Sequence, residues 1–179
     1  KFGDIGFDYN LGANWTDSLK FRASPNSLNR ECVGYYSANC GPANGQIQPR
    51  ISWQQRTALS YGPVTMSLLW RHFSSAKYEP GLPALFTGTL TNGFGVSSAL
   101  AGKTVNLNRI PAYDYFDLNA QFDVSKELLI TLGISNLFDK KPPLVGSAAG
   151  TTTANSGNTF PSTYDPLGRS YSASVRLKF

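Results

Sequence analysis

The sequence alternates between apolar and polar residues over unusually long stretches. From residue 4 to residue 22 the odd positions are mainly apolar and the even positions are polar or glycine, and Asp17 alone breaks the pattern. Side chains of a β-strand point to opposite faces in turn, so this period of two predicts a long strand with one apolar and one polar face. A helix, with 3.6 residues per turn, would mix both kinds of side chain on every face.

Five further segments repeat this alternation: 51–60, 64–71, 115–122, 128–135 and 171–179. Their apolar faces carry no charged residue, whereas their polar faces hold Arg56, Arg71, Asp117, Arg176 and Lys178. The sequence therefore predicts an all-β protein of about six antiparallel strands, with one face that could contact hydrocarbon.

The connections between these segments indicate a membrane protein. They are short at 61–63 and 123–127, and long at 23–50, 73–112 and 136–169. Compact soluble domains seldom contain structureless loops beyond ~12–15 residues. Bacterial outer-membrane barrels combine short periplasmic turns with long extracellular loops, and so we expect an antiparallel transmembrane β-barrel. The longest apolar runs fall well short of the ~18–20 residues that a membrane helix needs, which excludes a helical membrane protein.

Six strands are too few to close such a barrel, since bacterial examples begin at about eight strands. We therefore expect the 179 residues to be part of a larger barrel, cut at its N-terminal end, because Lys1 begins directly in strand-like sequence without a secretory signal. Two alternatives remain. One is a complete small barrel, acting as a passive pore or structural protein, with a further hairpin within 84–100. The other is a soluble β-sandwich binding module.

The last third of the chain carries a specific combination of short motifs. Residues 113–118 read Tyr-Asp-Tyr-Phe-Asp-Leu, residues 136–140 read Asn-Leu-Phe-Asp-Lys, and residues 164–171 read Tyr-Asp-Pro-Leu-Gly-Arg-Ser-Tyr, before the terminal Phe179. This combination resembles the C-terminal region of TonB-dependent receptors, the active transporters of the bacterial outer membrane. The resemblance implies that residues 1–179 are the C-terminal portion of a barrel of about 22 strands. It further implies a plug domain and a TonB-contacting segment, both absent from these residues, and uptake of a siderophore, carbohydrate, cobalamin or similarly scarce nutrient.

The final segment places Tyr171, Val175, Leu177 and Phe179 on one face. This pattern resembles the signal that the barrel-assembly machinery recognises, and it is also what a lipid-facing last strand requires. Both interpretations can hold, because an amphipathic edge strand offers unpaired backbone groups to a partner.

Cys32 and Cys40, the two cysteines, lie close together in a stretch rich in Gly, Pro and Asn. A local disulfide is favoured over two free thiols, and it would suit an oxidising compartment. A metal site is disfavoured, because neither histidine nor further cysteine lies nearby. We expect no cofactor.

The residues disfavour catalysis and nucleic-acid binding. His72 is the sole histidine, and its parity in the alternation places it on the lipid-facing side, away from any nucleophile in the lumen. The net charge is +5, but the basic residues are scattered. Many lie in the long loops or at upper strand ends, where they either pair with lipopolysaccharide phosphates or face solvent: Lys20, Arg22, Arg30, Arg50, Lys77, Lys103, Arg109, Lys140, Lys141 and Arg169.

Two groups of loop residues have both a structural and a functional interpretation. Asp139 could contact a ligand, but Asn and Asp commonly shape turns, and we expect 136–139 to form one before Pro142. Loop aromatic residues either contact the small-molecule substrate or pack the loops themselves: Tyr35, Tyr36, Tyr78, Phe86, Phe94 and Phe160. The charged residues of the polar faces are expected to meet the plug or water, and no substrate-binding residue is assigned.

Overall fold

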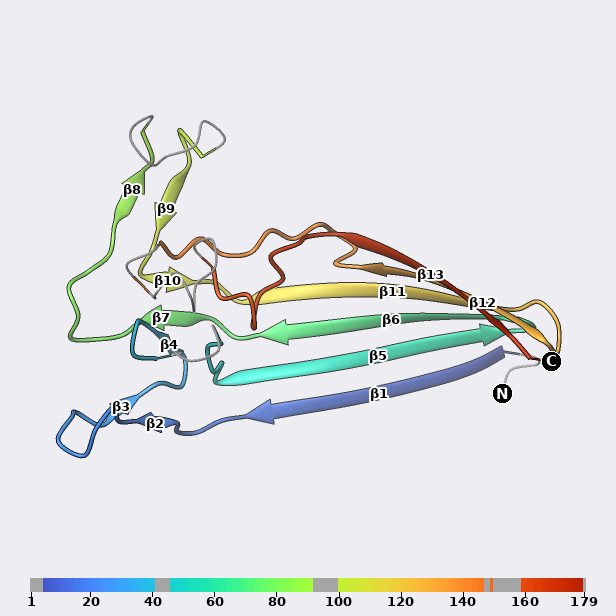
Figure 1. Ribbon diagram of the computed structural model, residues 1–179, viewed down its shortest axis with the longest axis horizontal. Helices are drawn as coiled ribbons and strands as arrows, with labels where there is room; N and C mark the ends of the chain where they lie inside the picture. The colour runs from blue at the N-terminus through green and yellow to red at the C-terminus, as the bar shows by residue number, and fades with distance from the viewer. Residues whose placement is uncertain (1–4, 41–45, 92–99, 147–148, 150–158, 179) are drawn as a thin grey trace.

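A computed structural model describes residues 5–40, 46–91, 100–146, 149 and 159–178. Its main feature is one six-stranded antiparallel sheet with the strand order β1-β5-β6-β11-β12-β13 (Figure 1). The strands are β1 (Ile5–Trp15), β5 (Ile51–Tyr61), β6 (Val64–Phe73), β11 (Tyr113–Asp123), β12 (Leu128–Ser135) and β13 (Ser170–Leu177). The prediction of an all-β chain with six long strands is confirmed. The first strand is shorter than predicted, because the chain leaves the sheet after Trp15, just before Asp17.

The strand register places all the apolar alternating positions on one face of the sheet. Residues directly opposite each other on neighbouring strands share a face, and Leu118 lies opposite both Leu68 and Ile134. The same register holds across the other pairs, where Leu11 meets Gln55 and Ile130 meets Val175. We call this side the outward face and the polar side the lumen face.

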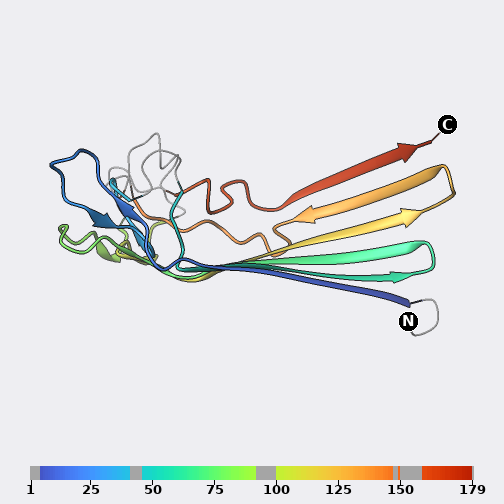
Figure 2. The ribbon, with the colours of Figure 1, turned by 90° about the horizontal axis from the view of Figure 1, so that it is seen from below.

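The outward face of the sheet has no second layer over it in the part of the chain that the structure describes. The sheet is a single curved layer (Figure 2), and outward side chains are accordingly exposed, with Phe7 at 67% and Leu11 at 55%. A soluble sandwich would bury this face under a second sheet. The β-sandwich alternative is therefore wrong for these residues.

The strand lengths fit a bilayer. β1, β5 and β11 each contain 11 residues, and a tilted membrane strand needs about 9–11. Among the described residues, no helix has the length and apolar character required to cross a membrane.

The two ends of the sheet differ, as the loop lengths predict. Tight turns join β5 to β6 and β11 to β12 at one end, where both chain termini also lie (Figure 1). The first turn uses Gly62 with φ of 53°, a left-handed conformation that suits glycine. In the second turn the hydroxyl of Ser125 accepts hydrogen bonds from the backbone N–H groups of Glu127 and Leu128.

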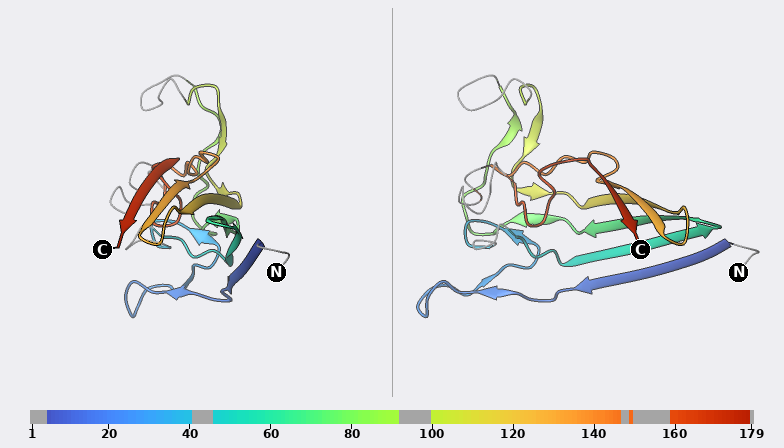
Figure 3. Two further views of the ribbon diagram at one scale, coloured as in Figure 1. Left: turned by 90° about the vertical axis from the view of Figure 1, so that its right-hand side faces the viewer. Right: turned by 45° about the vertical axis from the view of Figure 1, so that its right-hand side comes forward.

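The long connections gather at the other end and form small sheets. β2 (Lys20–Phe21) pairs with β3 (Arg30–Glu31), and β7 (Ala76–Tyr78) lies between β10 (Arg109–Ile110) and β4 (Tyr35–Tyr36). β8 (Thr87–Thr89) and β9 (Thr104–Asn106) form a separate ribbon that projects from the rest (Figure 3). The hairpin considered within 84–100 therefore does not enter the main sheet in the described residues.

The main sheet is open. β1 pairs only with β5 and β13 only with β12 among the strands described, so each leaves one row of backbone groups without a strand partner. With two unpaired edges, the sheet corresponds to a segment of a barrel wall and not to a closed barrel.

The two-faced sheet makes a testable prediction for neighbouring positions of β12. In the full-length protein, Leu132→Arg should reduce the amount of folded protein in the membrane, because an arginine on the lipid face of a barrel costs ~2–4 kcal/mol near the midplane. Thr131→Arg, one residue away on the lumen face, should assemble nearly normally. Heat-modifiable gel mobility of membrane fractions measures both, and equal loss in the two variants would contradict the assignment of faces.

Candidate functional site

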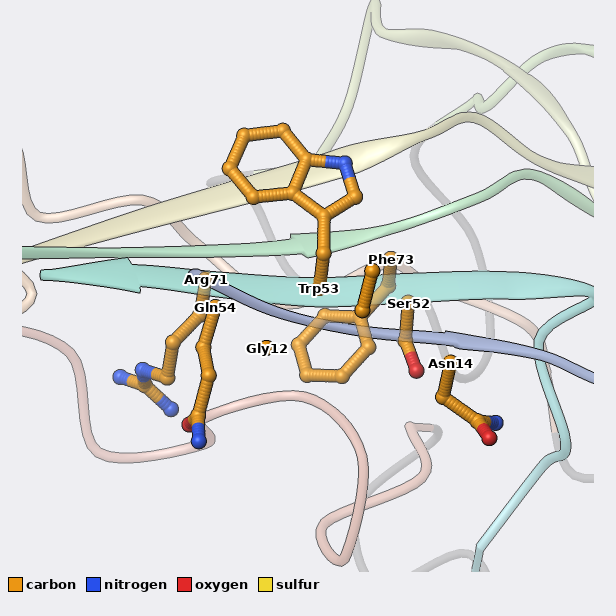
Figure 4. Close-up of a pocket in the computed structure, with 8 residues that line it drawn as sticks. Gly12, Asn14, Ser52, Trp53, Gln54, Arg71 and Phe73 are labelled. Carbon is orange, nitrogen blue, oxygen red and sulfur yellow. The ribbon is translucent and has the colours of Figure 1, made fainter. Parts of the chain in front are cut away.

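The candidate site is a shallow hollow of about 330 Å³ on the lumen face, near the loop end of β1, β5 and β6. Its polar lining comes from Asn14, Ser52, Gln54 and Arg71. Figure 4 shows the Gln54 and Arg71 side chains extending to the same side, while the indole of Trp53 points to the opposite one. The alternation that creates two faces thus also assembles this group of hydrogen-bonding side chains.

Gly12 provides the open space in the hollow. It lies opposite Gln54, and Gln54 lies opposite Arg71, so the three form one row across three strands. A Cβ added at Gly12 would lie 3.8 Å from Cγ of Gln54, an ordinary contact. Alanine therefore fits at this position, whereas a larger side chain would extend into the hollow.

The positive charge of Arg71 is balanced within the wall. Its Nε donates to Oδ2 of Asp117 at 3.1 Å and its Nη2 donates to Oδ1 at 3.3 Å. Its guanidinium carbon lies 5.4 Å from the ring centroid of Tyr115, an arrangement that adds a cation–π attraction. The hollow therefore offers neutral amide and hydroxyl groups beside an already paired arginine, and Nη1 of that arginine makes no contact with Asp117.

The residues 136–139 form a turn that is tied to this ion pair. The backbone N–H of Asn136 donates to Oδ1 of Asp117 at 2.8 Å, and the Asn136 side chain bonds both N and O of Lys140. Asn136 and Asp139 adopt φ angles of 52° and 51°, which Asn and Asp tolerate better than most residues. These hydrogen bonds support the structural interpretation of residues 136–139 as a turn.

Asp139 links the end of β12 to the start of β13. Its Oδ1 accepts the backbone N–H of Arg169 at 3.0 Å, and its Oδ2 accepts Nζ of Lys141 at 2.8 Å. The Lys141 contact, followed by the Arg169 N–H, lowers the pKa of the Asp139 carboxyl. A carboxylate held in this way serves the turn, and we assign it no ligand contact.

A buried cluster of loop residues adjoins the hollow through Phe73, which lines the hollow and packs against the cluster. We call it the loop core, and it consists of Tyr36, Ile47, Ala76, Ile110, Tyr113, Tyr115, Val145, Ala149, Phe160 and Tyr164. Tyr113 and Tyr115 belong to the lumen face of β11, so the loops pack onto the inner side of the wall. Burial raises the pKa of the Tyr36 and Tyr164 hydroxyls, which keeps both groups neutral.

Three of the six loop aromatic residues that could have met a ligand serve this packing instead. Tyr36 and Phe160 are fully buried, with ring centroids 5.8 Å apart, and Tyr78 lies 5.7 Å from Tyr36. Phe86 remains half exposed, and Phe94 lies outside the described residues. Large apolar area removed from water explains why these rings turn inward.

The structure joins Cys32 and Cys40 in a disulfide within the loop region. The same loop is held by two carboxylates. Glu79, at 5% exposure, accepts hydrogen bonds from Arg30 and Ser37. Glu31 accepts the Ser18 hydroxyl and the backbone N–H groups of Leu19 and Val33.

Two predicted features lie on the outward side, away from the hollow. His72 lies on the outward face, as its parity predicts, with Nδ1 2.8 Å from Oδ1 of Asp114. In β13, Tyr171, Val175 and Leu177 share the exposed outward face. Phe179 lies outside the described residues, so recognition by the barrel-assembly machinery stays a prediction.

The described residues contain no group of three or more His, Cys, Asp or Glu that could hold a metal ion. The sequence did not predict the Arg71–Asp117 ion pair or the packing of Tyr113 and Tyr115 in the loop core. Their positions on the lumen face were readable from the alternation, but their pairing depends on the register between β6 and β11.

Comparison with solved structures identifies the architecture. The siderophore receptor PirA from Acinetobacter baumannii matches 100% of this chain over 20% of its own length, with 18% sequence identity and a TM-score of 0.52. The chain has the fold of a siderophore-receptor barrel wall. The ferric enterobactin receptor PfeA from Pseudomonas aeruginosa matches 98% of this chain over 20% of its own, at 16% identity and a TM-score of 0.48. No protein-family model and no curated protein matches the sequence.

The resemblance to TonB-dependent receptors is thus confirmed at the level of the fold. The chain spans about one fifth of the length of the solved receptors, 20% in both comparisons. The hollow, the ion pair and the loop core are each formed by residues of this segment.

The Arg71–Asp117 pair should stabilise the wall. In the full-length protein, Asp117→Asn leaves the guanidinium without its charged acceptor and weakens the bond to the Asn136 N–H. We expect a loss of about 1–3 kcal/mol, measured as a lower temperature for the heat-modifiable transition. Asp123→Asn, at the exposed end of the same strand, should leave that temperature nearly unchanged. An Asp117 variant as heat-resistant as the parent would contradict this role.

Loop order should also depend on pH through Glu31. The Ser18 hydroxyl, followed by the backbone N–H groups of Leu19 and Val33, lowers the pKa of Glu31 from 4.5 to about 2. A group with a lowered folded pKa stabilises the fold fully above its unfolded pKa and loses this effect as pH falls through its folded pKa. The contribution is therefore complete above pH 4.5 and disappears towards pH 2.

Hydrogen exchange of residues 18–40 measures this effect. Relative to the parent, Glu31→Gln should speed exchange at neutral pH, and the difference should shrink between pH 4.5 and 2. Glu127→Gln, in the turn at the opposite end, is the matched control. A parent–variant difference that stays constant over this range would show that the Glu31 charge does not order the loop.

Proposed function

We propose that residues 1–179 are the C-terminal portion of the β-barrel of a TonB-dependent receptor in the bacterial outer membrane, which imports a siderophore. The observation that carries this proposal is the open two-faced sheet, whose full length matches the barrel wall of a siderophore receptor. In lipid, both unpaired edges require further strands, because hydrocarbon cannot satisfy backbone N–H and C=O groups.

Within such a receptor, the lumen face meets the plug and the passing substrate, and the hollow at Gly12 is our candidate contact for either. Its neutral amide and hydroxyl groups suit an oxygen-rich ligand, since they hydrogen-bond without demanding a fixed charge. TonB contacts the receptor through parts of the protein that these residues do not include. A carbohydrate or cobalamin is the alternative cargo, and the uptake experiment below distinguishes these from a siderophore.

Transport, rather than catalysis, is the activity we propose, since the solved neighbours are described as receptors. A passive pore built from this chain alone would need further strands in the main sheet. The two additional antiparallel strand pairs among the described residues, β2–β3 and β8–β9, lie outside that sheet, and we therefore do not favour the pore.

Uptake by cells tests the proposal. Iron-starved cells that produce the full-length receptor should accumulate radiolabelled iron from a ferric siderophore, and a protonophore should abolish this uptake because active transport needs an energised inner membrane. Labelled cobalamin and oligosaccharide serve as parallel cargoes. Uptake that persists with the protonophore would indicate a passive pore, and the absence of uptake for every cargo would overturn the transport proposal.

The hollow provides a matched pair of variants for the same assay. Gly12→Leu should lower siderophore uptake several-fold while leaving the amount of folded receptor unchanged, because its side chain fills the space beside Gln54 and Arg71. Gly12→Ala, which the local spacing accommodates, should transport normally. Normal uptake by the leucine variant would remove the hollow from the transport path.

A further inference from the structure

The outward surface of the loop region carries two cations directly opposite each other. In the register of β7 and β10, Lys77 pairs with Arg109 and Ala76 pairs with Ile110. Ala76 and Ile110 are buried in the loop core, and so Lys77 and Arg109 point away from it, where both are exposed. Like charges directly opposite on a sheet are destabilising. A bound anion would relieve this repulsion.

No such anion is supplied by the described residues. Neither Lys77 nor Arg109 has a salt bridge or side-chain hydrogen bond in this part of the chain. Glu79, two residues after Lys77, is buried and is engaged by Arg30 and Ser37. Asp114 is held by Trp70 and His72. The two cations are therefore available to a ligand from outside the chain.

On the outward face, the rows of paired residues change from apolar to polar in the direction of the Lys77–Arg109 pair. On the outward face, Leu68 lies opposite Leu118, the next row pairs Trp70 with Phe116, and the row after it pairs His72 with Asp114. The Trp70 and Phe116 rings stack with centroids 5.4 Å apart. Aromatic rings of this kind gather where acyl chains meet headgroups. The outer boundary of the hydrocarbon thus lies near the Trp70–Phe116 row.

The cation pair lies farther out from the membrane than this boundary. Lys77 and Arg109 are each five residues along the chain from the His72–Asp114 row, which places them at most ~18 Å beyond it. They lie on the same side of the wall, because the loop core occupies the lumen side of both β6–β7 and β10–β11. A molecule with acyl chains against Leu68 and Leu118 would therefore extend its phosphorylated sugars in the direction of the two cations.

We propose that the Lys77–Arg109 pair is a binding site for the phosphate of an outer-leaflet glycolipid, whose acyl chains lie along the apolar rows of β6 and β11. The phosphorylated sugars of such a lipid project beyond the acyl boundary, and phosphate is the anion that lysine and arginine bind well. Charge complementarity and continuity with the apolar rows both favour this occupant over a soluble anion. The inference rests on the proposed outer-membrane location, and it does not depend on which cargo is transported.

Binding of purified lipid A tests this site. The full-length receptor in detergent is titrated with bisphosphorylated lipid A and with dephosphorylated lipid A of the same acyl composition, and lipid-bound states are counted by native mass spectrometry. We expect the phosphorylated form to bind about tenfold or more tightly, because each basic residue near a membrane surface contributes ~1 kcal/mol. The double variant Lys77→Gln, Arg109→Gln should lose most of this preference.

The control variant Lys103→Gln, Lys126→Gln removes the same charge elsewhere and should keep the preference. Heat-modifiable mobility confirms that each variant is folded. The site is overturned if the Lys77, Arg109 double variant keeps the parental preference, if inorganic phosphate displaces the lipid at equal concentration, or if an acidic peptide binds the pair more tightly than the lipid does. Siderophore uptake is measured separately, so a failed transport proposal and a failed lipid site give different results.

Discussion

Backbone hydrogen bonding in hydrocarbon is the constraint on which the rest of this structure depends. Lipid offers no partner to an N–H or C=O group, so a spanning strand must pair along its whole length on both sides. β5, β6, β11 and β12 each have a strand neighbour on both sides, and β12 covers β11 over residues 118–123. The pairing fixes the register, and the register in turn keeps the mainly apolar row of each strand on the outward face.

The same pairing builds the inner surface. Because neighbouring strands are in register, lumen residues form rows across several strands, and one row brings together Gly12, Gln54 and Arg71. The arginine is neutralised by Asp117, which also accepts the N–H of Asn136. The polar wall is therefore connected to the turn after β12, and the loop core packs on Tyr113 and Tyr115 just above it.

The sequence predicted the wall well and the loops poorly, for a physical reason. Alternation is a local property, so it identified the strands and placed His72 on the outward face. Between β6 and β7 the alternation is interrupted at Ser74 and Ser75, so that Ala76 turns inward and Lys77 outward. Parity cannot be carried across such a break.

Packing between residues far apart in the chain could not be predicted from the sequence either. Tyr36 and Phe160 are separated by most of the chain, yet they are packed together in the loop core, and nothing local distinguishes them from the half-exposed Phe86. The opposition of Lys77 and Arg109 likewise depends on a pairing between two short strands. Residue type alone gave these positions both a structural and a functional interpretation, and only their neighbours in space separate the two.

The bond between Asp139 and the Arg169 N–H has a consequence for how this protein can change. It brings together the two ends of a connection of almost thirty residues, at a point just above the membrane-spanning strands. Since the entropy of closing a loop rises only slowly with its length, exposed residues between these two anchors can be added or removed without moving the last strand, provided that Val145, Phe160 and Tyr164 keep their places in the loop core. The same turn that gives the barrel wall a fixed end thus confines changes of length to the exposed part of this connection.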